Sequence, residues 1–166
     1  WMAGYFLVTP CWWASRDAGD EITIPKPSFC GSRINQMAFY RNRLLMLSGE
    51  DIIASRNGDY FNFWGKTALG VQDDDPIDIT AGSTYPSRLY DSIETNAGLL
   101  LFSPNEQFLL TTDQDLLTTK TAKVTGLSSW RFNTSTHPVS MGAGVGFLSN
   151  AGDHSRYFEM VNISKD

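Results

Sequence analysis

With 166 residues, of which 42% are hydrophobic, 13% aromatic and 19% charged, the chain has the composition of a packed globular protein and can form a core of its own. Its formal net charge of -5 argues against a protein that holds nucleic acid by neutralising phosphates, which requires clustered Lys and Arg. No run approaches the ~20 apolar residues of a membrane-spanning helix, so we expect a soluble chain.

The expected elements are β-strands throughout. Helical periodicity is scarce, whereas short apolar runs bounded by Gly, Asn, Asp, Ser or Pro recur along the whole chain. The sequence therefore predicts a mainly β fold of antiparallel strands. In chain order the expected strands are 34–40, 43–47, 52–55, 77–81, 98–103, 107–112, 121–125, 145–149 and 156–161.

Three segments share one format, an apolar strand, a polar turn and a second apolar strand: 44–55, 99–112 and 145–161. Their starts are separated by roughly the 40 to 50 residues typical of propeller blades. We therefore expect a segment 1–28 that enters the domain and a β-rich, propeller-like region over 29–166. The alternative is a β-sandwich, which regularly spaced short strands also fit.

The two ends indicate an excerpt of a longer, multidomain protein. The chain starts at Trp1 rather than at a methionine, and it stops at Asp166 without a closing helix or strand pattern. Residues 1–13 are apolar and aromatic, but they lack a basic flank and contain Pro10, so they match a signal peptide poorly.

The sequence indicates no catalytic, metal or cofactor site. Cys11 and Cys30 lie outside any Cys-x-x-Cys pair and have no His at metal-ligand spacing, so we expect buried free thiols. His137 and His154 come with no nucleophile motif and are expected in turns or at the surface. Gly142-Ala-Gly-Val-Gly146 opens no helix, so a glycine-tolerant strand or bulge is expected there rather than a dinucleotide loop.

Residues 73–78, Asp-Asp-Asp-Pro-Ile-Asp, are the densest carboxylate cluster. A calcium loop would place several oxygens around one cation, but the register of an EF-hand is missing. The preferred interpretation is an Asx-type turn ahead of a strand, in which Asp side chains cap backbone N–H groups and Pro76 fixes φ. An enzyme is therefore not expected.

Arginines and aromatic residues cluster in the first half of the chain. Arg41 and Arg43 alternate around Asn42, so on one strand both would project to the same face, and Arg56 follows the next strand. They could bind phosphate or glycan, but contacts with carboxylates are the plainer interpretation. The partners considered are Glu50, Asp51 and Asp59. The aromatic run 60–64 is too dense to point one way, so part of it is expected in the core and part in a subunit contact.

Taken together, these motifs resemble one family in order and spacing. Trp13-x-x-Arg16-x-x-Gly19-Asp20, Pro25-x-Pro27-Ser28-Phe29 and Arg41-Asn-Arg-Leu44 with Leu47-Ser-Gly-Glu50 are similar to the nozzle proteins of short-tailed, T7-like phages, also called tail tubular protein B. The resemblance continues through residues 60–63, 75–78, 99–103 and 107–108. The family-motif residues are Arg16, Asp20, Pro27, Phe29, Arg41, Asn42, Arg43, Leu44, Gly49, Glu50, Ser55, Tyr60, Phe61, Phe63, Asp75, Pro76, Asp78, Phe102, Gln107 and Phe108.

The resemblance implies a structural virion protein without a cofactor, assembled in the host cytoplasm into the phage tail. It implies six copies that form the distal tail tube below a ring of adaptor proteins, with tail fibres near the junction. It also implies a β-propeller among other mainly β domains, and transient contact with viral DNA as the genome leaves through the lumen. An acidic chain suits such a channel, since cationic contacts would hold a polyanion back. We expect acidic or neutral lumen-facing side chains.

Two other functions stay open on sequence grounds. One is a tail-associated β-protein that binds or cleaves glycan and touches the host outer membrane or surface glycan. Cleavage would require paired carboxylates across a cleft beside exposed aromatic rings. The other is a propeller-like cellular scaffold, which neighbouring genes would distinguish from a tail protein.

Overall fold

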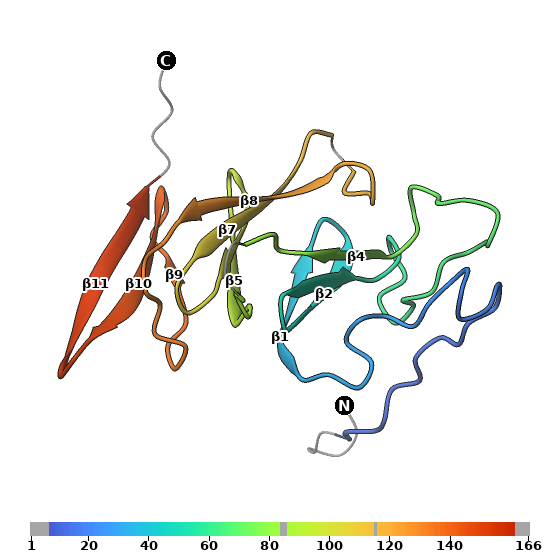
Figure 1. The fold of residues 1–166 in the computed structure, drawn as a ribbon, viewed down its shortest axis with the longest axis horizontal. Coiled ribbons are helices and arrows are strands. Elements are labelled where there is room, and N and C mark those ends of the chain that lie inside the picture. Colours follow the sequence, from blue (N-terminus) through green and yellow to red (C-terminus); the bar gives the residue numbers. More distant parts are fainter. Residues whose placement is uncertain (1–6, 84–85, 115, 162–166) are drawn as a thin grey trace.

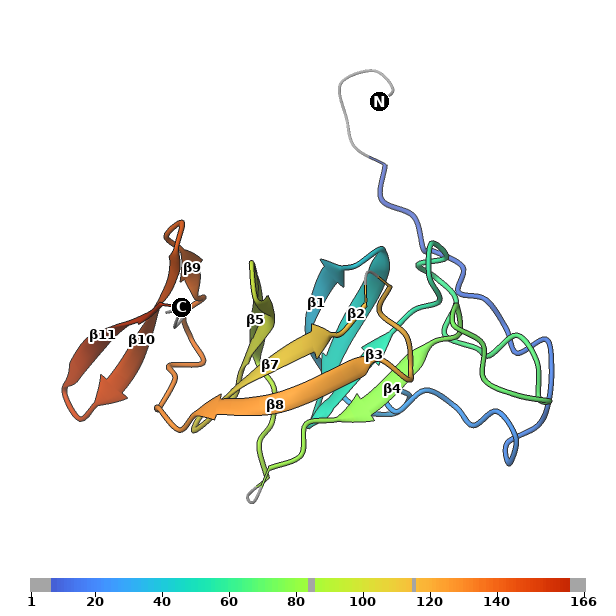
Figure 2. The ribbon, with the colours of Figure 1, turned by 90° about the horizontal axis from the view of Figure 1, so that it is seen from above.

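The computed structural model describes residues 7–83, 86–114 and 116–161. Every regular element within these ranges is a β-strand, and the strands form three antiparallel sheets. Figures 1 and 2 show the sheets one after another along the molecule, in chain order. The mainly β, antiparallel prediction is confirmed, although the sheets do not close into a ring within the described residues.

Sheet 1 is a four-stranded meander in which neighbours in sequence are neighbours in space. Its first turn, Arg41-Asn42, has φ angles of 49° and 60°, the left-handed backbone of a two-residue hairpin turn. The predicted hairpin of residues 44–55 is confirmed, with Leu45 opposite Ala54. The strands are β1 (Ile34–Tyr40), β2 (Arg43–Ser48), β3 (Asp51–Ala54) and β4 (Ile77–Thr80).

Sheet 2 repeats this meander, and the predicted hairpin of residues 99–112 is confirmed by the pairing of Leu101 with Phe108. Its first strand was not predicted, because Asp-Ser-Ile-Glu-Thr over residues 91–95 holds a single strongly apolar residue. The strands are β5 (Asp91–Thr95), β6 (Gly98–Phe102), β7 (Gln107–Thr112) and β8 (Ala122–Ser128).

Sheet 3 has three strands in the order β11-β10-β9 within the described residues. They are β9 (Val139–Ser140), β10 (Gly144–Ala151) and β11 (His154–Val161). The predicted hairpin of residues 145–161 is confirmed, with Phe147 opposite Phe158. The glycine motif behaves as predicted, since Gly142 turns the chain with φ 79° and β10 begins at Gly144.

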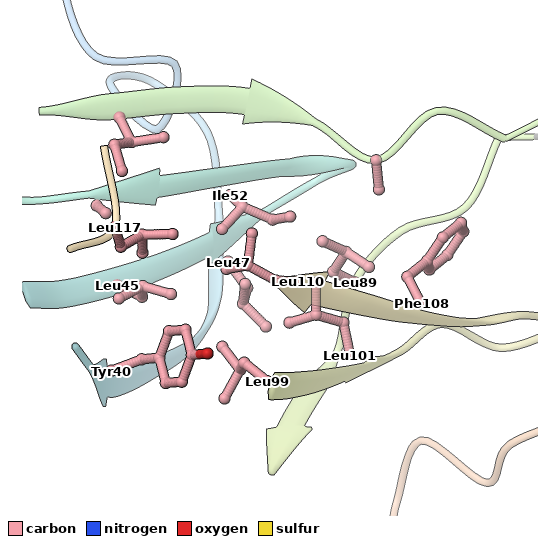
Figure 3. Packing of buried hydrophobic residues seen from close by; sticks show 13 residues of the cluster. Tyr40, Leu45, Leu47, Ile52, Leu89, Leu99, Leu101, Phe108, Leu110 and Leu117 are labelled. Carbon is pink, nitrogen blue, oxygen red and sulfur yellow. The ribbon is translucent and has the colours of Figure 1, made fainter. Parts of the chain in front are cut away.

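The core lies between the sheets and covers both faces of sheet 2. Successive residues of a strand point to opposite faces, so Leu99 and Leu101 pack toward sheet 1 while Leu100 and Phe102 pack toward sheet 3. Figure 3 shows residues of sheet 1, such as Leu47, facing those of sheet 2. Burial on both faces explains why β6 is a continuous apolar run rather than an alternating one.

Gly98, the first residue of β6, is expected to be intolerant of a side chain. Its φ is 146°, and an added Cβ would lie 2.5 Å from the carbonyl oxygen of Leu110. Gly98→Ala should therefore lower the free energy of unfolding by at least ~2 kcal/mol in urea denaturation. Gly126→Ala in β8 is the control, because nothing lies within 4 Å of a Cβ there. Equal stability of the two variants would contradict this account of the β5–β6 turn.

Candidate functional site

The motif residues of sheet 1 converge on one buried side chain, Arg43, at the start of β2. Its side chain is fully buried, and Nη1 donates to the carbonyl oxygens of Ser55 at 2.7 Å and Asp75 at 2.6 Å. Nη2 donates to the carbonyl oxygen of Asp73 at 2.9 Å. Burial lowers the pKa of Arg43, and the nearby charges of Asp74 and Asp75 oppose that shift. Arg43 thus ties β2 to the end of β3 and to the loop before β4.

Two predictions about the arginines are wrong. Arg41 and Arg43 do not share a face of one strand, because Arg41 lies in the β1–β2 turn and is exposed, while Arg43 is buried. The two terminal nitrogens of the buried guanidinium donate to backbone carbonyls rather than to carboxylates, and its Nε has no hydrogen-bond partner. Arg56 pairs with Asp74, through Nη2 and Oδ2 at 2.7 Å, and not with the carboxylates that were considered for these arginines.

The other turn residue, Asn42, joins two turns of sheet 1. Its Nδ2 donates to Oδ1 of Asn57 at 3.0 Å, and its Oδ1 accepts from the hydroxyl of Tyr60 at 2.8 Å. The carbonyl of Asn42 accepts from the N–H of Gly58 at 2.9 Å. A side chain with a donor and an acceptor is therefore needed at this left-handed position, which Asn tolerates well.

Asp75 caps backbone N–H groups ahead of a strand, as predicted, but it forms no Asx turn, because both N–H groups precede it in the sequence. Its buried carboxylate accepts the backbone N–H of Lys66 at 2.9 Å and of Gln72 at 2.8 Å. Pro76 follows, and β4 begins at Ile77. Because the carboxylate caps this loop and Arg43 binds the carbonyl of the same residue, the loop is fixed from both sides.

The incoming segment, residues 7–33 ahead of β1, is bound to sheet 1 at several points. Ser28 donates both its N–H and its hydroxyl to the carboxylate of Asp78 in β4, at 2.8 Å. Asp20 caps a local turn, and the backbone hydrogen bond from Thr23 is the main reason that its pKa is lowered. Arg16 pairs with Glu21 at 3.1 Å. Pro27 is buried. Phe29 packs on Phe63 with ring centroids 5.1 Å apart. The guanidinium of Arg16 lies over the ring of Trp64.

Asp74 should contribute to stability in a pH-dependent way. The hydrogen bond from Arg56 is the main cause that lowers its pKa from the ordinary 3.8. Since the folded-state pKa lies below the unfolded one, the contribution is complete above pH 3.8 and is lost as pH falls through the lowered value. The stability difference between the parent and Asp74→Asn, measured in urea, should be constant from about pH 5 to 7 and shrink below about pH 4. A difference that grows on acidification would contradict the pairing.

The β2–β3 turn connects sheet 1 to the next sheet. The carbonyl of Gly49 accepts from the N–H of Leu89 at 2.7 Å, and that of Glu50 accepts from Ala81 at 2.9 Å. The motif residues Gly49 and Glu50 therefore hold the segment that leads from β4 to β5.

The motif residues of sheet 2 form a second group, apart from Arg43. Phe102 and Phe108 are buried on its two faces, toward sheets 3 and 1 respectively. The amide of Gln107 is fully buried: Nε2 donates to the carbonyl of Trp130 at 2.8 Å, and Oε1 accepts from the hydroxyl of Ser128 at 2.7 Å. This amide fixes the chain where β8 leads toward sheet 3.

Sequence reasoning missed Asp91, which links all three sheets. Its buried carboxylate accepts from Nε2 of Gln36 in β1 at 2.5 Å, and its other oxygen lies 2.5 Å from Nδ1 of His137, just before β9. The side chain of His137 is exposed, as predicted. These partners are 55 and 46 residues away in sequence, so no local pattern could have indicated the contact.

The remaining sequence candidates add no chemistry. Cys11 and Cys30 are both exposed, so the prediction of buried thiols is wrong: neither reaches the space between the sheets. No three His, Cys, Asp or Glu side chains within 7–83, 86–114 and 116–161 are grouped so that they could hold a metal ion. No helix in the described part of the chain is long and apolar enough to cross a membrane.

A shallow groove lies between residues 23–27 and the loop 65–71, with Ile53 and Phe63 among its lining residues. Two carboxylates line it, those of Asp75 and Asp78, and both are engaged: Asp75 caps its own loop, and Asp78 holds Ser28. The groove therefore offers apolar contact rather than a free pair of carboxylates.

Comparison with known proteins places these features in a family. The family model for the bacteriophage nozzle protein matches residues 2–166. The tail tubular protein gp12 of Escherichia phage T7 is 35% identical over 155 residues, which make up 92% of this chain and 19% of that protein. The chain thus spans about a fifth of the length of this relative. The chain belongs to the bacteriophage nozzle protein family.

Proposed function

We propose that the protein containing this chain is a structural subunit of a phage tail nozzle, which forms the distal tail tube through which the genome is ejected. The observation that carries the proposal is the family match over residues 2–166, supported by the similarity to a tail tubular protein. As a virion component, the subunit acts by assembly rather than by bond chemistry. The polar groups that the motif residues bury serve to hold loops and sheets in place.

Within that subunit, we propose that residues 29–166 form a sector of a β-propeller, entered by residues 1–28. Two consecutive four-stranded meanders and a third sheet stack in chain order. Their first strands come together, since β1 lies against β5 and β5 against β9, as the inner strands of neighbouring blades do. A β-sandwich pairs two sheets, whereas sheet 2 is covered on both faces, which favours the propeller.

The proposed partners follow from the family. Six copies form the tube, a ring of adaptor proteins holds it, tail fibres attach nearby, and viral DNA touches the lumen in passing. The net charge of -5 suits a wall that does not retain a polyanion, so lumen-facing side chains of this segment are acidic or neutral. A lumen lined by arginines at this level would contradict that part. Assembly takes place in the host cytoplasm before the virion is released.

The glycan-cleaving alternative receives less support from the geometry. Hydrolysis of a glycosidic bond requires two carboxyl groups that flank the bond in a cleft. The carboxylates of Asp75 and Asp78, which line the groove, are occupied by hydrogen bonds that hold loops. We therefore propose a subunit that is not an enzyme.

The native mass of the full-length protein, alone and with its adaptor, tests directly whether the subunits assemble into the proposed tube. We expect a sixfold assembly, formed either alone or on the adaptor ring. A stable monomer that ignores the adaptor but binds host polysaccharide or outer-membrane vesicles would overturn the proposal in favour of glycan recognition.

A further inference from the structure

The outer face of sheet 1, which turns away from sheet 2, carries large apolar side chains that are exposed. We define this outer face by Met37 and Phe39 of β1, Phe61, and Trp13 of the incoming segment. Their exposed fractions are 62%, 65%, 45% and 50%. Single exposed apolar residues are ordinary on a protein surface, but a contiguous group marks a contact.

Strand pairing shows that these residues continue a core. Met37 lies opposite Met46 and Phe39 opposite Leu44, and directly opposed residues point to the same face. Met46 and Leu44 are buried in a cluster with Phe63. The same apolar face is therefore buried on β2 and exposed on β1, where Met37 and Phe39 lie.

Ring contacts form two pairs on the outer face, whose members Tyr60 and Phe61 are adjacent in sequence. Phe39 meets Tyr60 edge-on with centroids 5.3 Å apart, and Trp13 meets Phe61 edge-on at 5.4 Å. The backbone N–H of Ala14 donates to the carbonyl of Phe61 at 2.9 Å, which holds the incoming segment beside the sheet. The incoming segment, blue in Figure 1, approaches sheet 1 on the side away from β5.

The two existing sheet contacts show what kind of surface covers such a face. Sheet 2 packs on one face of sheet 1, and sheet 3 packs in the same way on the far face of sheet 2. In the second contact Ile93, on the first strand of its sheet, is partly buried against the cluster shared with sheet 3. Met37 and Phe39, on the first strand of sheet 1, have no sheet against them within the described residues.

Residues 7–12, which precede the outer-face residue Trp13, indicate which sheet would cover the outer face. They form no regular element here and carry Leu7, Val8 and Trp12 at 79%, 91% and 92% exposure, although they are apolar. They precede β1 as β4 precedes β5 and β8 precedes β9, and both β4 and β8 are edge strands of their sheets. Pro10 fits an edge strand, where one side needs no N–H donor.

We propose that the outer face of sheet 1 docks a further antiparallel sheet of the same longer protein, in which residues 7–12 form the edge strand. The proposal rests on the propeller sector proposed above and names the neighbour of its first sheet. The length of the relative leaves room for such a sheet, because this chain covers only 19% of it. A second copy of the protein is the competing occupant.

Photo-crosslinking of the full-length protein distinguishes a sheet of the same chain from a second copy of the protein. A benzophenone amino acid replaces Phe39, the protein is irradiated, and denaturing electrophoresis with peptide mass spectrometry identifies the product. The matched control carries the same group at Asn105, an exposed residue of the β6–β7 turn. We expect a crosslinked product that migrates as one chain and joins position 39 to a peptide outside residues 7–161, in several-fold higher yield than any such product from position 105.

A crosslinked dimer from position 39 would overturn the proposal in favour of a second copy. The absence of any product above the control would overturn it as well. Because the readout is a contact within one chain, it is independent of whether six subunits assemble. A failed crosslink together with a sixfold native mass would reject this docking surface and leave the tube intact.

Discussion

Replacing Arg43 with methionine is expected to lower the free energy of unfolding by about 3 to 5 kcal/mol. The guanidinium is fully buried and donates to three carbonyl oxygens, those of Ser55, Asp73 and Asp75. Methionine fills much of the volume but donates nothing, so these carbonyls lose a buried charged donor. Loop 57–76 then loses its attachment to β2.

Urea denaturation followed by tryptophan fluorescence measures this loss, and limited proteolysis locates it. Arg41→Met is the matched control two residues away, since Arg41 is exposed in the turn and lies on the ring of Tyr40. We expect the control to cost less than about 1 kcal/mol. An Arg43→Met variant that unfolds at the same urea concentration as the control would show that the buried guanidinium does not hold the loop.

Replacing Leu101 with aspartate is expected to destabilise the chain by several kcal/mol, on the order of 4 or more. Leu101 lies in the middle of β6 with no exposed surface, in the cluster shared by sheets 1 and 2. An aspartate there is a buried charge without a partner, and it also removes apolar contacts with Phe108 across the strand pair. The contact between the two sheets would open.

Leu127→Asp is the control for this change, because Leu127 lies in β8 of the same sheet and is 48% exposed. It should shift the melting temperature little, whereas Leu101→Asp should prevent cooperative unfolding or lower the melting temperature strongly. Similar melting of both variants would mean that Leu101 does not lie in the core between the sheets.

Strands with a strong local signal could be predicted from the sequence. The expected strands 34–40 and 107–112 match β1 and β7 at both ends, because apolar residues there stop at turn-forming ones. β5 and β9 were missed for a physical reason. Both hold few apolar residues and are placed by pairing with β6 and β10 rather than by their own composition.

In the candidate site, too, local contacts could be predicted from the sequence and long-range contacts could not. That an aspartate caps N–H groups ahead of β4 was predictable, but its partners were not, because Asp75 accepts from Gln72 and from the more distant Lys66 rather than from the residues that follow it. Arg43 was misjudged, because it was expected to share a face with Arg41, whereas a left-handed turn at Arg41 and Asn42 separates Arg41 from β2. The exposure of Cys11 and Cys30 depends on where the incoming segment packs, which their local sequence does not encode.

A map of the intact phage tail by electron cryo-microscopy tests the central claim most directly, namely that this chain is a stack of sheets within a tube-forming subunit. We expect six copies of residues 29–161 in the wall of the distal tube, with the first strands of sheets 1, 2 and 3 arranged side by side around one axis. Density for this segment outside the tube, or its absence from the tail, would contradict the account.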